Sequence, residues 1–271
     1  MNLKDELKKL MLLKDCELQT INLDPIIKEM LRQIGSTDPE LRDHMIYIFF
    51  SRLIQGDFLK GDQLQYILEI TMDNDHLFYR IEEINTDGVF TRSFSSLVMA
   101  LVIEVDIKKT FLPQDLVMKA FNRTIEYFHK ERDLRGYVEE KGWAHSVAHG
   151  ADLMEALIKH PKINTRYYRE ALAAIEQFVL RDHGVYIDDE DERLVFPIEA
   201  MLKWETVEIV EWIHGLDSKV LKVKGETRYF HLKINTSHFL KSLYFRLKFN
   251  ESKAFICPHI EGVLKNIHDD H

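Results

Sequence analysis

The sequence is organised around KGWAHSVAHGADLMEAL, the stretch from Lys141 to Leu157. Its apolar residues recur at every third or fourth position, which predicts a helix with one buried stripe. On such a helix His145, His149 and Asp152 project from the same face, so two imidazoles and a carboxylate lie together. This trio borders the apolar stripe. The stretch therefore predicts a core helix that also carries a candidate site.

The same helical pattern recurs at intervals of about fifty residues. Apolar helices are expected from Leu41, Thr91, Trp143 and Glu192, each after a polar turn and each followed by a second amphipathic helix. The chain has only six prolines and 11 glycines, which is typical of helical proteins. We therefore predict an all-α fold, a HEAT- or armadillo-like α-α superhelix of about four helix pairs. A non-repetitive helical bundle is the alternative.

The predicted superhelix forms a single domain over residues 1–271. Repeat-like units span about 36–82, 83–137, 138–187 and 188–217, and a less regular C-terminal cap covers 218–271. Alternating residues around Lys224-Gly225-Glu226 predict a short β-hairpin in this cap, with a loop followed by a helix as the alternative. A helix capped by Asn235 is predicted to run to Leu247.

The composition limits the partners and the compartment. The formal net charge is −9, which argues against a general nucleic-acid binder because phosphate affinity comes mostly from Lys and Arg. Cys16 and Cys257 lie far apart and in no metal-ligand spacing, so a reduced cytosol is the expected compartment. The N-terminus lacks the apolar core of a signal peptide. No run of about 18 apolar residues occurs, so no membrane span is expected. We expect a cytoplasmic protein.

The string GWAHSVAHGADLM, the helical rhythm and the later NTSHFLKSLYFRL helix resemble the uncharacterised bacterial DUF2785 family. Trp143, His145, His149 and Asp152 occupy the positions of that family's Trp-x-His-x-x-x-His-x-x-Asp signature, and the helix from Asn235 is a second marker. The resemblance covers most of the chain. It implies an all-helical protein of bacterial or phage origin, and it implies no activity because the family has none assigned.

Three roles are open for the candidate residues Trp143, His145, His149 and Asp152. In the first, they bind a small polar ligand or a protein partner, nothing is turned over and no cofactor is expected. In the alternative, His145, His149 and Asp152 hold a divalent metal for a hydrolase, and an acidic residue from 188–192 positions water. In the third, the imidazoles only bond neighbouring helices or turn carbonyls, and Asp152 supports one of them or pairs with an arginine. We take the first role, a binding or interaction module with a polar pocket, as the working hypothesis.

Overall fold

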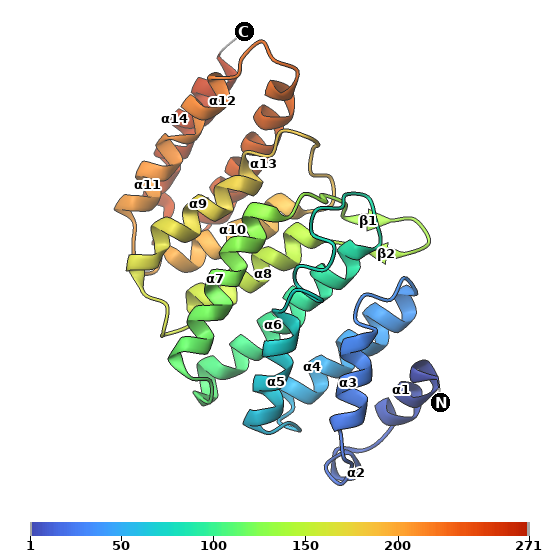
Figure 1. The fold of residues 1–271 in the computed structure, drawn as a ribbon. Coiled ribbons are helices and arrows are strands. Elements are labelled where there is room, and N and C mark those ends of the chain that lie inside the picture. Colours follow the sequence, from blue (N-terminus) through green and yellow to red (C-terminus); the bar gives the residue numbers. More distant parts are fainter. Residues whose placement is uncertain (1, 270–271) are drawn as a thin grey trace.

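The computed structural model describes residues 2–269 and is mostly helical (Figure 1). Within these residues the one sheet is a small two-stranded hairpin. The all-α prediction is therefore confirmed. Met1, Asp270 and His271, which the predicted domain includes, lie outside the described residues.

The first half of the chain folds into short N-terminal helices followed by two long ones. In chain order they are α1 (Leu3–Met11), α2 (Asp15–Leu18), α3 (Asp24–Arg32), the π-helical η1 (Glu40–Tyr47), α4 (Ile48–Gln55), α5 (Gly61–Thr71), α6 (Gly88–Lys109) and α7 (Gln114–Lys130).

The second half begins with the hairpin and continues as helices to the C-terminal end. The elements are β1 (Tyr137–Val138), β2 (Gly142–Trp143), α8 (Ser146–Lys159), η2 (Thr165–Tyr167), α9 (Tyr168–Val179), α10 (Glu190–Met201), α11 (Val207–His214), α12 (Leu216–Leu221), α13 (Arg228–Lys248), η3 (Ala254–Ile256) and α14 (Cys257–His268).

The core lies along a row of helices in which each packs against the next, α4 on α6, α6 on α8, α8 on α10 and α10 on α13. A second row contains α7, α9 and α11, again packed in that order. Figure 1 shows the chain advancing from α1 at one end to α12 and α14 at the other. Helices α6 and α7 follow each other between residues 83 and 137, and α10 is followed by α11, whereas η1, α4 and α5 lie between residues 36 and 82.

Helix α6 is a long and mostly buried element of this core. By length and composition it could cross a membrane, but 83% of its most apolar window is buried inside the structure. Its contacts with α4, α5 and α8 account for that apolar composition, as expected of the central helix of a packed fold.

The β-hairpin predicted around Lys224-Gly225-Glu226 is wrong. This segment is a turn between α12 and α13, and Gly225 adopts a φ of +92° there. The alternating pattern also fits helices, because Val220, Val223, Tyr229 and Leu232 gather into a small apolar cluster across the turn. A short alternating stretch is compatible with the period of a strand and with that of a helix. Here the apolar residues are buried by packing as helices.

The predicted cap at Asn235 is also wrong, since α13 begins at Arg228 and Asn235 lies in its interior. The buried Asn235 side chain instead holds the loop that follows α9. Its amide donates to the carbonyl oxygens of Arg181 and Gly184, both at 2.9 Å, and its oxygen accepts from the Tyr186 N–H at 3.1 Å. Asn235 therefore does not cap its own helix, and its side chain instead satisfies backbone N–H and C=O groups of a neighbouring loop.

A buried ion pair joins α6 to the end of α7. Arg92 and Glu131 are both fully buried, and Nε of Arg92 lies 2.6 Å from Oε2 of Glu131. The carboxylate also accepts the backbone N–H groups of Arg132 and Asp133, so it fixes the segment that leads into the hairpin.

We predict that Glu131→Gln lowers the free energy of unfolding by about 3 kcal/mol or more, because it leaves the Arg92 charge buried without its partner. Urea denaturation measures this. Glu126→Gln is the matched control, since the exposed Glu126 pairs with Arg123 and Lys130 at the surface and its loss costs below about 1 kcal/mol. Equal losses in the two variants would contradict the prediction.

Candidate functional site

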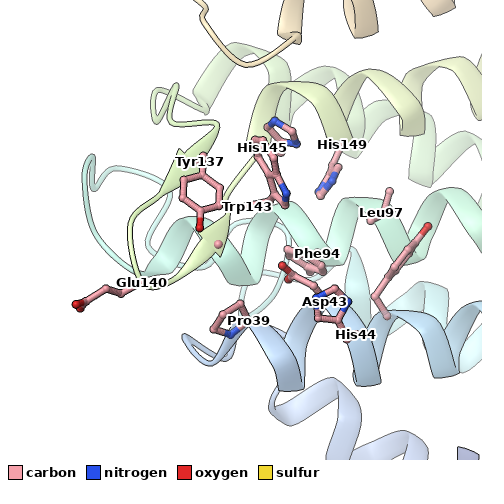
Figure 2. A pocket seen from close by; sticks show the side chains of 12 residues that line it. Pro39, Asp43, His44, Phe94, Leu97, Tyr137, Glu140, Trp143, His145 and His149 are labelled. Atoms are coloured by element: carbon pink, nitrogen blue, oxygen red, sulfur yellow. The ribbon is translucent and has the colours of Figure 1, made fainter.

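A cleft of about 440 Å³ lies where η1, α6, the hairpin and the start of α8 meet (Figure 2). Segments about a hundred residues apart in the sequence form its walls. They contribute Pro39, Asp43, His44 and Tyr47 from the η1 region, Phe94 and Leu97 from α6, Tyr137, Glu140, Gly142 and Trp143 from the hairpin, and His145 and His149 from the α8 region. Three of the four residues proposed from the sequence are among them.

The hairpin sets the position of Trp143. Strand β1 pairs with β2 so that Tyr137 faces Trp143, and the two rings meet edge to face at 5.1 Å. Gly142 has a φ of +77°, and a Cβ there would lie 2.9 Å from Cβ of Pro39. Glycine therefore permits both the turn and the close approach of the hairpin to η1. Trp143 stands at the rim, 42% exposed.

The predicted helix from Trp143 is wrong at its start. Helix α8 begins at Ser146, and His145 precedes it with a left-handed φ of 48°. Trp143 is on a strand. The imidazole of His145 nevertheless stacks on the Trp143 indole with ring centroids 4.4 Å apart, and it meets His149 edge to face at 5.7 Å. The two histidines are thus brought together, although only His149 is held by the helix itself.

Arg42 forms the base of the site and is completely buried. Its Nη1 donates to the carbonyl of Ser36 at 2.7 Å, and Nη2 donates to the carbonyls of Lys141 at 2.7 Å and Trp143 at 3.4 Å. The guanidinium carbon lies 4.2 Å from the ring centroid of Phe90, a cation–π contact. One side chain therefore ties η1 to the hairpin and to α6.

Asp43 follows Arg42 and lines the cleft. Its Oδ1 lies 2.8 Å from Nε of Arg42, a contact between opposite charges that lacks hydrogen-bond geometry. Burial raises the pKa of Asp43, and the adjacent guanidinium opposes that shift. The cleft thus holds a carboxylate whose hydrogen-bonding capacity is incompletely used.

The hydrogen bonds of His149 fix its tautomer. Nδ1 lies 2.8 Å from Oγ of Ser93, and that hydroxyl also donates to the carbonyl of Ala144. A serine has one proton and a carbonyl can only accept, so Ser93 accepts its other bond from Nδ1–H of His149. Burial, with the nearby charges of His145 and Arg193, lowers the pKa of His149 well below its usual value. The ring is therefore neutral and Nε2 keeps its lone pair.

That lone pair is available to the cleft. The His149 side chain is only 8% exposed, and among residues 2–269 its Nε2 has no hydrogen-bond partner. Figure 2 shows the ring pointing from α8 toward Phe94 and Asp43.

His145 has the opposite tautomer for the same kind of reason. Its Nε2 lies 3.1 Å from the carbonyl oxygen of Asp188, which can only accept, so Nε2 carries the proton and Nδ1 the lone pair. Burial lowers the pKa of His145 as well. The site therefore presents two neutral imidazoles whose N–H groups are already used by the protein.

Asp152 does not join them. Both of its oxygens pair with Arg193, Oδ1 accepting from Nε at 2.9 Å, and it does not line the cleft. Within the described chain no group of three or more His, Cys, Asp or Glu side chains is placed to hold a metal ion. The metal-dependent hydrolase with His145, His149 and Asp152 stays a prediction, and its three ligands are not assembled in this structure.

The acidic turn after the α9 loop does lie beside the hairpin, and its carboxylates have partners there. Oδ2 of Asp188 accepts the Tyr137 N–H at 3.0 Å, Asp191 accepts the Ser242 hydroxyl at 2.6 Å, and Glu192 pairs with Arg246 at 3.2 Å. Asp188 therefore supports the hairpin, and Asp191 and Glu192 are held by α13, whereas Oε1 of the buried Glu190 has no hydrogen-bond partner within the described part of the chain.

The sequence analysis missed the wall opposite α8. Arg42 and Asp43 lie about a hundred positions before the histidines, and Ser93 about fifty, so no local pattern links them to the site. The adjacent Asp43 and His44 were a possible signal, because such pairs occur in many polar sites. Only the packing of η1 and α6 against α8 shows where that pair lies.

A larger hollow, about 620 Å³, lies between the end of α3 and the start of α6. Several of its ionisable groups are paired with their neighbours. Nδ1 of His76 lies 2.9 Å from Asp73, Arg32 pairs with Glu29, and Asp87 accepts from Lys141 at 2.7 Å. The 440 Å³ cleft is the better candidate because its imidazole nitrogens are unused.

A family model described as "Protein of unknown function (DUF2785)" matches residues 77–245 of the chain, which include α6 to α10 and both histidines. Comparisons with curated proteins and with solved structures give no match.

We predict that stability decreases as the pH falls below about 6.5, in part through His149. Its folded pKa is lowered, so between the folded and unfolded pKa values the unfolded state binds more protons, and the free energy of unfolding rises with pH there. His149→Asn removes this titration while its amide can still donate to Ser93. Urea denaturation at about pH 5 and pH 7.5 should show a smaller pH effect in the variant, by up to about 1.4 kcal/mol per pH unit.

The control is His129→Asn, because His129 is exposed on α7 and away from the cleft. The same pH effect in wild type and His149→Asn would show that His149 is not buried in the neutral form.

Proposed function

Since the chain belongs to the DUF2785 family, whose description assigns no activity, we propose a function from the cleft itself. The protein is a binding module that holds a small polar ligand, or a polar side chain of a protein partner, between the hairpin and η1. Nothing is turned over. The unused Nε2 of His149 carries this proposal, because it belongs to a side chain that is more than nine-tenths buried and lines a cleft, where a ligand can donate a hydrogen bond to it.

The proposed scaffold is a HEAT- or armadillo-like superhelix in the cytoplasm. Two rows of helices, each helix packed on the next, support the superhelix, since solenoids bury their core in this way. The cleft then lies on one side of the α6 and α8 pair, and the hairpin is an insertion before α8 that closes one wall.

The residues have distinct proposed roles. His149 and His145 accept hydrogen bonds from the ligand, and Trp143 with Tyr137 offers ring surface at the rim. Arg42 and Ser93 are positioning residues, because they act through the hairpin and through His149. Asp152, proposed from the sequence as a fourth binding residue, would act only by holding Arg193 beside the site.

We predict that a mixed set of small ammonium, hydroxyl, amide and carboxylate compounds contains at least one class that shifts the imidazole NMR signals of His145 and His149 in a saturable manner. The compound should remain chemically unchanged in the same tube. His149→Asn should abolish the shifts, and His129→Asn, exposed on α7, should preserve them. No shift by any class would contradict the binding function, and conversion of a compound would favour an enzyme.

The hydrolase alternative has its own measurement. We predict that elemental mass spectrometry of tag-free protein finds no near-stoichiometric transition metal, because Asp152 is held by Arg193. A stoichiometric metal in wild type that disappears in His149→Asn would overturn this and favour the hydrolase.

A further inference from the structure

The polar groups of the cleft are unequal in charge. Asp43 and Glu140 are among the lining residues, whereas no lysine or arginine is. The remaining side-chain donors are the hydroxyls of Tyr47 and Tyr137, the indole N–H of Trp143 and the imidazole of His44. One of these carboxylates, Asp43, contacts the buried guanidinium of Arg42, which does not line the cleft, so the lining itself offers a negatively charged ligand no lysine or arginine.

The imidazoles of His145 and His149 add hydrogen-bond acceptors to the lining of the cleft. Each has given its N–H to the protein, His149 to Ser93 and His145 to the carbonyl of Asp188. What each offers to the cleft is a lone pair, which accepts hydrogen bonds and cannot donate one. The ligand must then supply the protons.

Arg42 lies beneath the site, but its positive charge is not offered to a ligand in the cleft. Its Nη atoms donate to the carbonyls of Ser36, Lys141 and Trp143, and its guanidinium faces the rings of Phe90 and Phe94. It has no exposed surface. Its charge is therefore paired with Asp43 and surrounded by carbonyl oxygens inside the protein, and its side chain does not line the cleft.

The aromatic rim is the last element. Tyr137 and Trp143 are 56% and 42% exposed, and Tyr47 lines the inner wall. Aromatic faces attract ammonium and guanidinium groups electrostatically, and they also cover an aliphatic chain. Lone pairs deep in the cleft and rings at its mouth thus match a cationic head on an apolar stem.

We propose that the ligand is an organic monocation, an alkylammonium or guanidinium group, whose N–H donors bond Nε2 of His149 and Nδ1 of His145 beside the Asp43 carboxylate. This rests on the proposed binding function and specifies its ligand class. The volume of about 440 Å³ exceeds the size of the head group alone, so the stem lies against Trp143 and Tyr137.

The test is calorimetric titration of the full chain at about pH 7.5 and low salt, where both imidazoles are neutral. Butylammonium and butylguanidinium are the cations, butanol the neutral analogue and butyrate the anion. We expect the cations to bind at least tenfold more tightly than butanol and butyrate. N-acetyl-lysine amide and N-acetyl-arginine amide then distinguish a partner's side chain from a free amine, because tighter binding of the amides indicates a protein partner.

Three variants connect the affinity to the site. His149→Asn, which keeps the bond to Ser93, and Asp43→Asn, which removes the charge, should each weaken cation binding tenfold or more. Asp115→Asn changes the net charge equally on the exposed start of α7 and should leave the affinity unchanged. Asp43→Asn removes the negative charge beside Arg42 and could prevent folding. In that case the loss of cation affinity is measured in His149→Asn and Glu140→Gln.

Tighter binding of butyrate or butanol would overturn the cation inference while leaving the binding function intact. No binding of any cation would also overturn it, and the mixed compound set then decides separately whether the cleft binds anything. An equal loss of affinity in Asp115→Asn would show that the cations are attracted by overall charge and not by the cleft.

Discussion

The buried guanidinium of Arg42 is the interaction on which the cleft depends. It bonds carbonyl oxygens on both walls, Ser36 before η1 and Lys141 in the hairpin, and its planar face rests on Phe90 of α6. Such a group has five donors in one plane, so it can satisfy backbone acceptors from several segments at once. Burying a charge is costly, and the oxygen atoms and the Asp43 carboxylate around Arg42 offset that cost. The hairpin, which has only two residues in each strand, is held more by this contact than by its own pairing.

The chemistry of the site follows from a second, smaller constraint, the single proton of Ser93. Because the Ala144 carbonyl takes that proton, His149 must donate from Nδ1 and leaves Nε2 as an acceptor. Burial then keeps the ring neutral. A ligand that donates a hydrogen bond to Nε2 would give this acceptor the partner that it lacks among the described residues. The proposed binding function is the simplest reason for a stable protein to keep such an atom beside a cleft.

Long helices were predictable from the sequence because their apolar residues recur over many turns, as in α6 and α8. The hairpin between them was not predictable, since strands of two residues leave no alternation, and Glu140, which is left-handed there, is of a type that seldom adopts that conformation. Two imidazoles were correctly placed together, whereas Asp152 turned to Arg193, which lies 41 positions away. The opposite wall required tertiary packing, because nothing local connects Asp43 to His149.

The most direct test of the central claim is the protonation state of His149 at about pH 7.5, measured from the imidazole ¹⁵N chemical shifts of the ligand-free protein. We predict a neutral ring with a protonated Nδ1 and an unprotonated Nε2, in contrast to the Nε2-protonated His145. On addition of a cation, the Nε2 signal of His149 should shift as it accepts a hydrogen bond. A protonated Nε2 in the free protein, whether in the other neutral tautomer or in a charged ring, would contradict the acceptor-lined cleft and the cation inference built on it.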